Sequence, residues 1–189
     1  MTNSSTQKPE HGYSLPIRIL HWVMALIMIS MILAGIAMVN GPWDGKFPPS
    51  RGMLYDYHRG MGFVLLVLVI IRLLAYRFTK PPSPLPLSIP HWQQMAAELT
   101  HFALYAALII HPIMGWYATN AWGVKNIGIF GLFDLPAIAE KNRTLGNFLL
   151  EIHGYIGFAI AGLVLLHIAA ALKHQFIDKD DTLKRMLKT

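Results

Sequence analysis

The sequence contains no cysteine. This absence excludes disulfides, thiolate zinc sites, iron–sulfur clusters, cysteine nucleophiles and covalent haem attachment through a C-x-x-C-H motif. Charged residues are also scarce, at 14% of the 189 residues against about 25% in ordinary soluble domains. A di-iron centre is disfavoured because it needs several inward-facing carboxylates, and Asp56, Glu98 and Glu151 lie only at the ends of apolar segments.

Apolar residues dominate the composition. They make up 54% of the chain, and the mean hydropathy is +0.42. A soluble domain of this length cannot bury so much apolar surface, and disordered chains are poor in it. The composition therefore predicts an integral membrane protein in contact with lipid. The net charge of +6 does not indicate a nucleic-acid partner, because membrane proteins collect Lys and Arg in their cytoplasmic loops.

Four apolar segments, at about 16–39, 55–77, 96–119 and 147–172, are each long enough to cross the bilayer. The hydrocarbon core is about 30 Å thick and a helix rises about 1.5 Å per residue. Residues 120–146 are partly apolar and are expected to lie on the bundle, and residues 173–189 are expected to form a short surface helix. No repeat or second domain is evident. The predicted fold is all-α, a single membrane-spanning four-helix bundle over residues 1–189.

Four spans place both termini on one side of the membrane. That side carries ten Lys or Arg residues and a net charge of +5, whereas the other side carries six and a net charge of +1. Positively charged loops stay in the cytoplasm. The charge distribution therefore predicts that both termini are cytoplasmic.

Six histidines lie within the four segments, where polar side chains are costly and point to function. The alternating direction of the spans gives each histidine a depth. Three of them lie toward the cytoplasmic side and three toward the outer side: His21, His101 and His167, and His58, His111 and His153, respectively. Each depth therefore holds histidines from different helices.

His153 and His167 are fourteen residues apart on the last span. At about 100° per residue they share one helix face, about 21 Å apart along the axis. One helix can thus offer one ligand to each of two stacked cofactors. His21 would then pair with His167, and His58 with His153.

Histidine pairs of this kind suit two non-covalent haem b groups, because iron takes a neutral imidazole on each face of the porphyrin. Small residues beside the ligands either leave room for the porphyrin or only allow close helix packing; they are Gly154, Gly157 and Gly162 near His153, and Gly60 and Gly62 near His58.

His101 and His111 are alternative ligands. They are ten residues apart, so their directions differ by about 80°. Pro112 also disturbs the helix beside His111. Further residues are candidate contacts to haem propionates or to a quinone, namely Arg51, Arg59, His101, Lys173 and His174.

Several stretches resemble the bacterial cytochrome b561 family of four-span di-haem membrane cytochromes. They are "RILHWVMA" around His21, "YHRGMGF" around His58, "LTHFALY" around His101, "EIHGYIGF" around His153 and "LLHIAAALKHQFIDKDDTLKRM" from His167 onward. The resemblance covers essentially the whole chain. It implies that the four paired histidines are the axial haem ligands and that the protein lies in the bacterial inner membrane. It also implies a relation to the b subunits of membrane hydrogenases and formate dehydrogenases, and one member type moves an electron from periplasmic superoxide to ubiquinone.

Iron with two histidine ligands has no open coordination site, which favours electron transfer over oxygen binding. The sequence shows no nucleotide or flavin motif, so the donor and acceptor are small molecules or partner proteins. We expect an oxidoreductase that carries electrons from an outer-side donor, with superoxide as a candidate, to the ubiquinone pool. The alternatives are a membrane-anchor cytochrome b subunit for a dehydrogenase or hydrogenase, which the short outer loops disfavour, and a haem-free channel or transporter, which a red preparation would exclude.

Overall fold

The computed structural model describes residues 12–41, 51–80 and 89–188. Its main elements are four long helices: α1 (Leu15–Asn40), α2 (Arg51–Phe78), α3 (His91–Trp122) and α4 (Arg143–Lys173). Each is long and apolar enough to cross a membrane, so the four predicted spans are confirmed. Every helix extends past its predicted limits, because the prediction followed apolar character whereas backbone hydrogen bonding continues into the flanking polar residues.

The ends of the helices follow from local sequence. Pro16 lies in the first turn of α1, where its missing N–H costs nothing, and the Gly41 N–H donates to the Ala37 carbonyl at 2.8 Å. The side chain of Asn142 accepts the Leu145 N–H at 3.1 Å and caps the start of α4. Gly123, with φ of 128°, ends α3 in a conformation that other residues rarely adopt.

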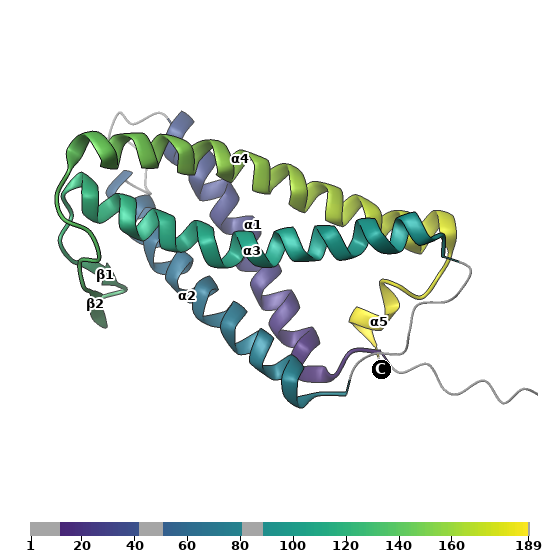
Figure 1. Cartoon of the computed structure of the whole chain (residues 1–189). Coiled ribbons are helices and arrows are strands. Elements are labelled where there is room, and N and C mark those ends of the chain that lie inside the picture. The colour runs from purple at the N-terminus through teal and green to yellow at the C-terminus, as the bar shows by residue number, and fades with distance from the viewer. Residues whose placement is uncertain (1–11, 42–50, 81–88, 189) are drawn as a thin grey trace, which may run out of the picture.

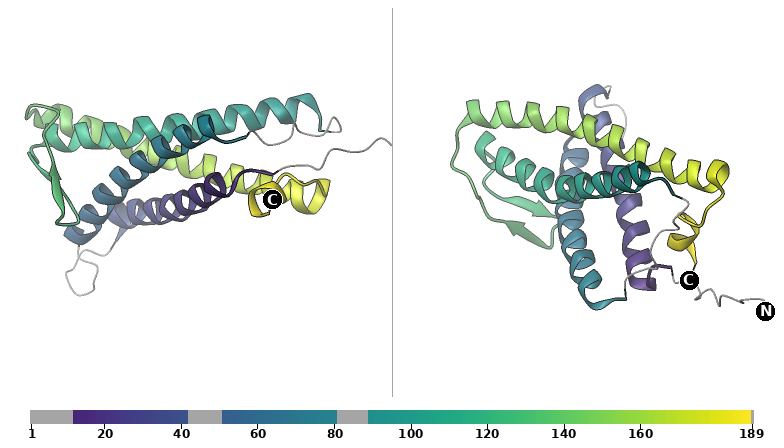
Figure 2. Two further views of the ribbon diagram at one scale, coloured as in Figure 1. Left: turned by 90° about the horizontal axis from the view of Figure 1, so that it is seen from below. Right: turned by 45° about the vertical axis from the view of Figure 1, so that its right-hand side comes forward.

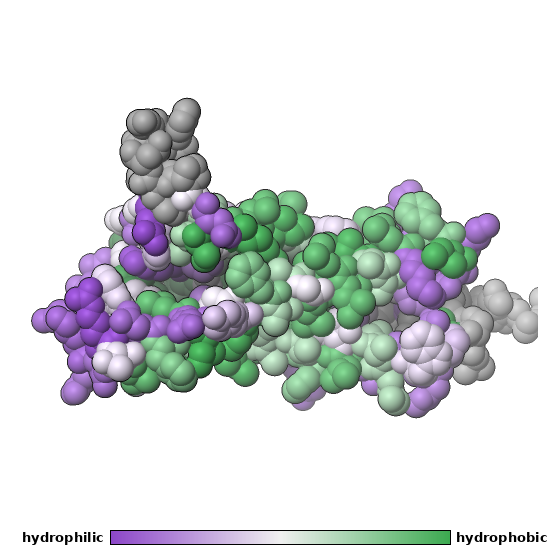
Figure 3. Space-filling model, turned by 90° about the horizontal axis from the view of Figure 1, so that it is seen from above, coloured by the Kyte–Doolittle hydropathy of each residue, from purple (hydrophilic) through white to green (hydrophobic). Residues whose placement is uncertain are grey.

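The helices form two pairs that cross each other. α1 packs along α2, α3 packs along α4, and α2 also contacts α3 (Figures 1 and 2). On the face that Figure 3 shows, apolar residues cover the middle and hydrophilic residues gather at both ends. Leu26 on α1 and Leu165 on α4 are 69% and 68% exposed, as suits side chains that face lipid.

A buried apolar cluster lies midway along the bundle. It consists of Met24 from α1 with Leu65 and Val69 from α2, and Leu108 and Ile109 from α3 pack against it. On α2 the cluster lies between His58 and the inner end of the helix. It therefore forms an apolar layer between the two depths at which the histidines lie.

A β-hairpin interrupts the otherwise helical fold. Its strands β1 (Ile127–Ile129) and β2 (Phe133–Leu135) are antiparallel, and their buried side chains pack against Phe63 and Trp116. The prediction that residues 120–146 lie on the bundle is confirmed. The four long helices confirm the all-α prediction, and the hairpin is a small addition to them. Strands of three residues are too short to show the alternation that identifies a strand in a sequence.

The C-terminal segment folds back to the start of α1. A short π-helix, η1 (His174–Asp178), follows α4, and α5 (Lys184–Leu187) is the predicted short surface helix. The Trp22 Nε1–H donates to the Met186 carbonyl at 3.0 Å, and the Tyr13 N–H donates to the Arg185 carbonyl at 3.1 Å. The start of α1 and the C-terminal helix therefore lie at one end of the bundle (Figure 2).

Candidate functional site

The bundle brings the six histidines of the spans into two groups. We call the group nearer the hairpin the outer layer and the group nearer α5 the inner layer. Each layer takes one histidine from each of three helices: His58, His111 and His153 form the outer layer, and His21, His101 and His167 form the inner layer. The depths predicted from the order of the spans agree with this grouping.

Within each layer one pair of rings is well separated. The ring centroids of His21 and His167 are 6.2 Å apart, and those of His58 and His153 are 6.1 Å apart. The rival histidines lie closer to the same partners. His101 is 5.3 Å from His167, and His111 stacks on His153 at 3.7 Å with an interplanar angle of 7°.

The wider separation suits an iron atom between two imidazoles. A metal–imidazole nitrogen bond of about 2.0–2.1 Å and a nitrogen-to-centroid distance of about 1.1 Å place two opposed centroids roughly 6.2–6.4 Å apart. The separations of the His21–His167 and His58–His153 pairs, 6.2 and 6.1 Å, lie at or just below the lower end of this range. The stacked His111–His153 pair is too close to hold a metal between its rings. The His111 ring instead packs against the His153 ring and supports its position.

The outer layer also contains polar atoms that the described residues do not satisfy. The Nδ1 atoms of His58, His111 and His153 are buried and have no hydrogen-bond partner there. A buried polar atom left unpaired costs about 1–3 kcal/mol. Three such atoms in one layer fit a site whose contacts are completed by a bound group.

Gly115 leaves room for the His153 ring, whereas Gly35 lies at ordinary contact distance from the His58 ring. A Cβ at Gly115 on α3 would lie 2.8 Å from His153 Cε1, and one at Gly35 on α1 would lie 3.7 Å from His58 Cε1. Sequence reasoning missed both, because each contact joins residues from different helices.

The five glycines singled out from the sequence differ in their surroundings. A Cβ at Gly157 would lie 3.8 Å from His111 Nε2, at ordinary contact distance. Gly154 and Gly162 face open space, as a slot for a flat cofactor requires. Gly60 instead lies against Phe130 in the turn of the hairpin, and Gly62 lies against Met31 of α1, so the helix-packing interpretation holds at Gly62.

Arg72 is a buried cation in the inner layer and is one of the ten basic residues that predicted the membrane topology. Arg72 is 8% exposed. Its guanidinium carbon lies 5.7 Å from the ring centroid of Tyr76 and 5.6 Å from that of Tyr105. It interacts electrostatically with His21 and with the other two inner histidines. The signal that could have found it is its spacing of fourteen residues from His58.

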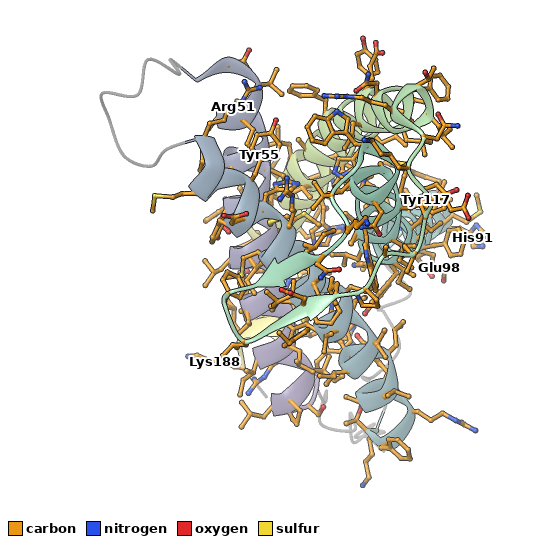
Figure 4. All side chains as sticks on the ribbon, turned by 90° about the vertical axis from the view of Figure 1, so that its left-hand side faces the viewer. Arg51, Tyr55, His91, Glu98, Tyr117 and Lys188 are labelled. Carbon is orange, nitrogen blue, oxygen red and sulfur yellow. The ribbon has the colours of Figure 1, made fainter. Side chains whose placement is uncertain are left out.

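The predicted outer contacts lie together at the start of α2. Arg51 and Arg59 lie over the ring of Tyr55 at 5.7 and 5.4 Å, and Arg59 pairs with Asp56 at 3.6 Å. Figure 4 shows Arg51 and Tyr55 at this end of the helix.

The predicted inner contacts engage acidic residues of the C-terminal turn. Lys173 Nζ pairs with Asp178, and His174 Nδ1 lies 2.6 Å from Asp180 Oδ2 and 3.2 Å from Asp178 Oδ2. Burial raises the pKa of Asp180, but hydrogen bonds from Thr182 and His174 outweigh burial and hold that pKa below its usual value. The ligand atoms of His174, Asp178 and Asp180 lie within 4.8 Å of one another, and Lys173 already supplies a cation to this group.

Comparison with known proteins identifies the family of the chain. The profile of the family described as prokaryotic cytochrome b561 matches residues 12–189. "Cytochrome b561 homolog 2" of Escherichia coli (strain K12) is 36% identical over 185 residues, which cover 97% of this chain and 95% of that protein. "Cytochrome b561 homolog 1" of the same organism is 30% identical over 171 residues, covering 89% and 92% of the two chains. "Probable superoxide oxidase CybB" of Yersinia pestis is 29% identical over 176 residues, covering 89% and 91%. The chain therefore belongs to the prokaryotic cytochrome b561 family.

Proposed function

We propose that this chain holds two haem b groups, one between His21 and His167 and one between His58 and His153, and carries electrons across the membrane. The family implies haem b as the cofactor. The observation that supports two sites most directly is the pair of ring separations, 6.2 and 6.1 Å, at two depths of one bundle.

The pairing of the histidines indicates which chemistry the bound haems would perform. A haem held by either histidine pair would supply one-electron transfer. The ligands come from helices that cross the whole bilayer, so their positions are fixed on rigid elements. The apolar layer of Met24, Leu65 and Val69 keeps water out of the space between the two sites.

Superoxide is the proposed donor at the outer layer. Arg51 and Arg59 place positive charge at this end of α2, although Asp56 offsets part of it. The name of the Yersinia pestis relative supports the same donor. Each superoxide anion gives up one electron and leaves as O₂. Two anions are therefore consumed for each quinone, which takes two electrons and two protons to become quinol.

Ubiquinone is the proposed acceptor at the inner layer. The excess of Lys and Arg at that end supports a cytoplasmic position for it, with both termini. His101, Lys173 and His174 are the candidate contacts for the quinone or for haem propionates. His174 already shares hydrogen bonds with carboxylates, and such a group is suited to deliver protons to a reduced quinone.

Haem analysis and quinone reduction test the proposal. A pyridine haemochrome assay of the purified chain is expected to give two haem b per chain, all extractable by acid acetone. Superoxide added with a soluble ubiquinone analogue is expected to yield one quinol for every two anions consumed. His153→Ala should lose this activity, whereas His91→Ala, an exposed histidine at the start of α3, should keep it.

Two results would contradict the proposal. A haemochrome assay that gives one haem per chain would show that one of the two proposed haem sites does not exist. A two-haem protein that superoxide cannot reduce, but that a membrane dehydrogenase reduces, would favour the membrane-anchor role instead.

A further inference from the structure

Arg72 has a position that the histidine ligands do not explain. The arginine is 8% exposed, and its Nε atom is buried without a hydrogen-bond partner among the described residues. Nor does any carboxylate in the described part of the chain lie within ion-pair distance of it. A guanidinium inside a membrane span is costly unless an anion or a polar group compensates it.

The spacing on α2 places Arg72 toward the inner layer. It follows His58 by fourteen residues, the same interval that separates His153 from His167 on α4. Residues at this interval share a helix face and lie about 21 Å apart along the axis. α4 therefore offers a histidine at each depth, whereas α2 offers a histidine at the outer layer and a cation at the inner layer. The electrostatic interaction of Arg72 with His21, His101 and His167 agrees with a position in the inner layer.

The surroundings of Arg72 orient the guanidinium without neutralising it. Tyr76 and Tyr105 lie against it from two helices, at 5.7 and 5.6 Å. Aromatic faces attract a cation but leave its charge in place. The planar guanidinium presents N–H donors in a fork that matches a carboxylate. Arg59 in the outer layer differs, because its side chain is 27% exposed and pairs with Asp56 at 3.6 Å.

We infer that Arg72 binds a propionate carboxylate of the haem held by His21 and His167, and that its charge makes the inner site easier to reduce than the outer site. This inference rests on the proposed function. The propionates are the anionic groups of haem, so they supply the counterion that Arg72 lacks. A buried cation favours the reduced, less positive state of a nearby redox group, because charge is poorly screened in an apolar interior. Electrons are then driven from the outer layer to the inner layer.

The test compares three variants of the full-length, haem-loaded protein. Arg72→Gln removes the charge, Arg72→Lys keeps the charge but removes the fork, and Arg77→Gln is the control, an exposed arginine on the same helix. Anaerobic redox titration gives the potential of each haem, and the haemochrome assay gives the haem content. Each substitution is repeated in a His153→Ala background, in which the surviving signal belongs to the inner site.

Arg72→Gln is expected to lower the equilibrium constant for reducing the inner haem at least tenfold, which is about 59 mV for a one-electron couple. Arg72→Lys should stay within threefold of the parent, and Arg77→Gln should match it. Redox-difference infrared spectra should show a shifted carboxylate band in Arg72→Gln alone. Loss of the inner haem in Arg72→Gln but not in Arg72→Lys would also support the inference.

Unchanged potentials and an unshifted carboxylate band in Arg72→Gln would overturn the inference. Loss of the inner haem from both Arg72 variants would do the same, since the shape of the residue rather than its charge would then matter. Neither result bears on the proposed function, which fails if the parent lacks two haems, cannot be reduced by superoxide, or transfers no electrons to a quinone.

Discussion

Replacing Gly115 by alanine is expected to disturb the outer layer and leave the inner layer intact. Gly115 lies on α3, where a Cβ would sit 2.8 Å from Cε1 and 3.2 Å from Nδ1 of His153. Carbon atoms pack best at about 3.5–4.0 Å, so the imidazole ring would have to retreat by roughly 0.7 Å or more. It cannot retreat toward His111, because that ring already stacks on it at 3.7 Å.

The size of the effect follows from overpacking. Adding a methyl group to a filled space costs about 1–3 kcal/mol, which corresponds to roughly a 5- to 150-fold loss of affinity when the displaced group is a ligand. We therefore expect Gly115→Ala to lower the occupancy of the outer haem or to shift it toward a high-spin spectrum. Haemochrome content and reduced-minus-oxidised spectra measure both effects.

Gly62→Ala is the matched control. Gly62 also lies within a helix, α2, and its added Cβ would meet Met31 at 3.6 Å, an ordinary van der Waals distance. Both substitutions change helix propensity equally, so the difference between them reports the contact with His153. If Gly115→Ala keeps two haems with the spectra of Gly62→Ala, the position of the His153 ring is wrong.

Four further outcomes are expected. His21→Ala and His167→Ala should share one spectral phenotype and the two outer-pair variants another, and the pairing is wrong if the spectra group differently. A C-terminal reporter should be active only in the cytoplasm, whereas periplasmic activity would reverse the sidedness. Trp22→Phe removes the hydrogen bond to Met186 and should cost about 0.5–1.5 kcal/mol, seen as a lower melting temperature and faster proteolysis of the C-terminal segment. Because the pKa of Asp180 is depressed, its stabilising contribution is present above the ordinary value of 3.8 and is lost as pH falls through the folded pKa, so Asp180→Asn should flatten the acid dependence of that proteolysis.

The parts of the site that follow from helical periodicity could be predicted. The shared face of His153 and His167 depends only on the residues per turn, and the depth of His21 and His58 depends only on the order and direction of the spans. The contact of Gly115 with His153 could not be predicted, since it depends on how closely α3 and α4 approach. The burial of Arg72 was missed because a basic residue near the end of a span also fits the positive-inside rule.

The contacts within the C-terminal turn also could not be predicted from the sequence. Lys173 and His174 were expected to contact haem or a quinone, and that prediction remains untested. Their pairing with Asp178 and Asp180 depends on the π-helix that follows α4, and no periodicity in the sequence shows it. The hairpin is a similar case, because its buried side chains pack against Trp116 and the segment after β2 is hydrogen-bonded to Trp116 and Asn120.

The proposed ligand pairs join helices that pack little against each other. In the described chain α1 packs mainly on α2 and α4 mainly on α3, whereas His21–His167 links α1 to α4 and His58–His153 links α2 to α4. At most 17% of the residues in the most apolar stretch of any span are buried inside the protein. Lipid is as apolar as leucine and gives the helices no hydrophobic reason to close on one another. Bonds from histidines on both helix pairs to a shared cofactor would therefore fix the crossing of the two pairs, so the residues that tune electron transfer would also hold the bundle together.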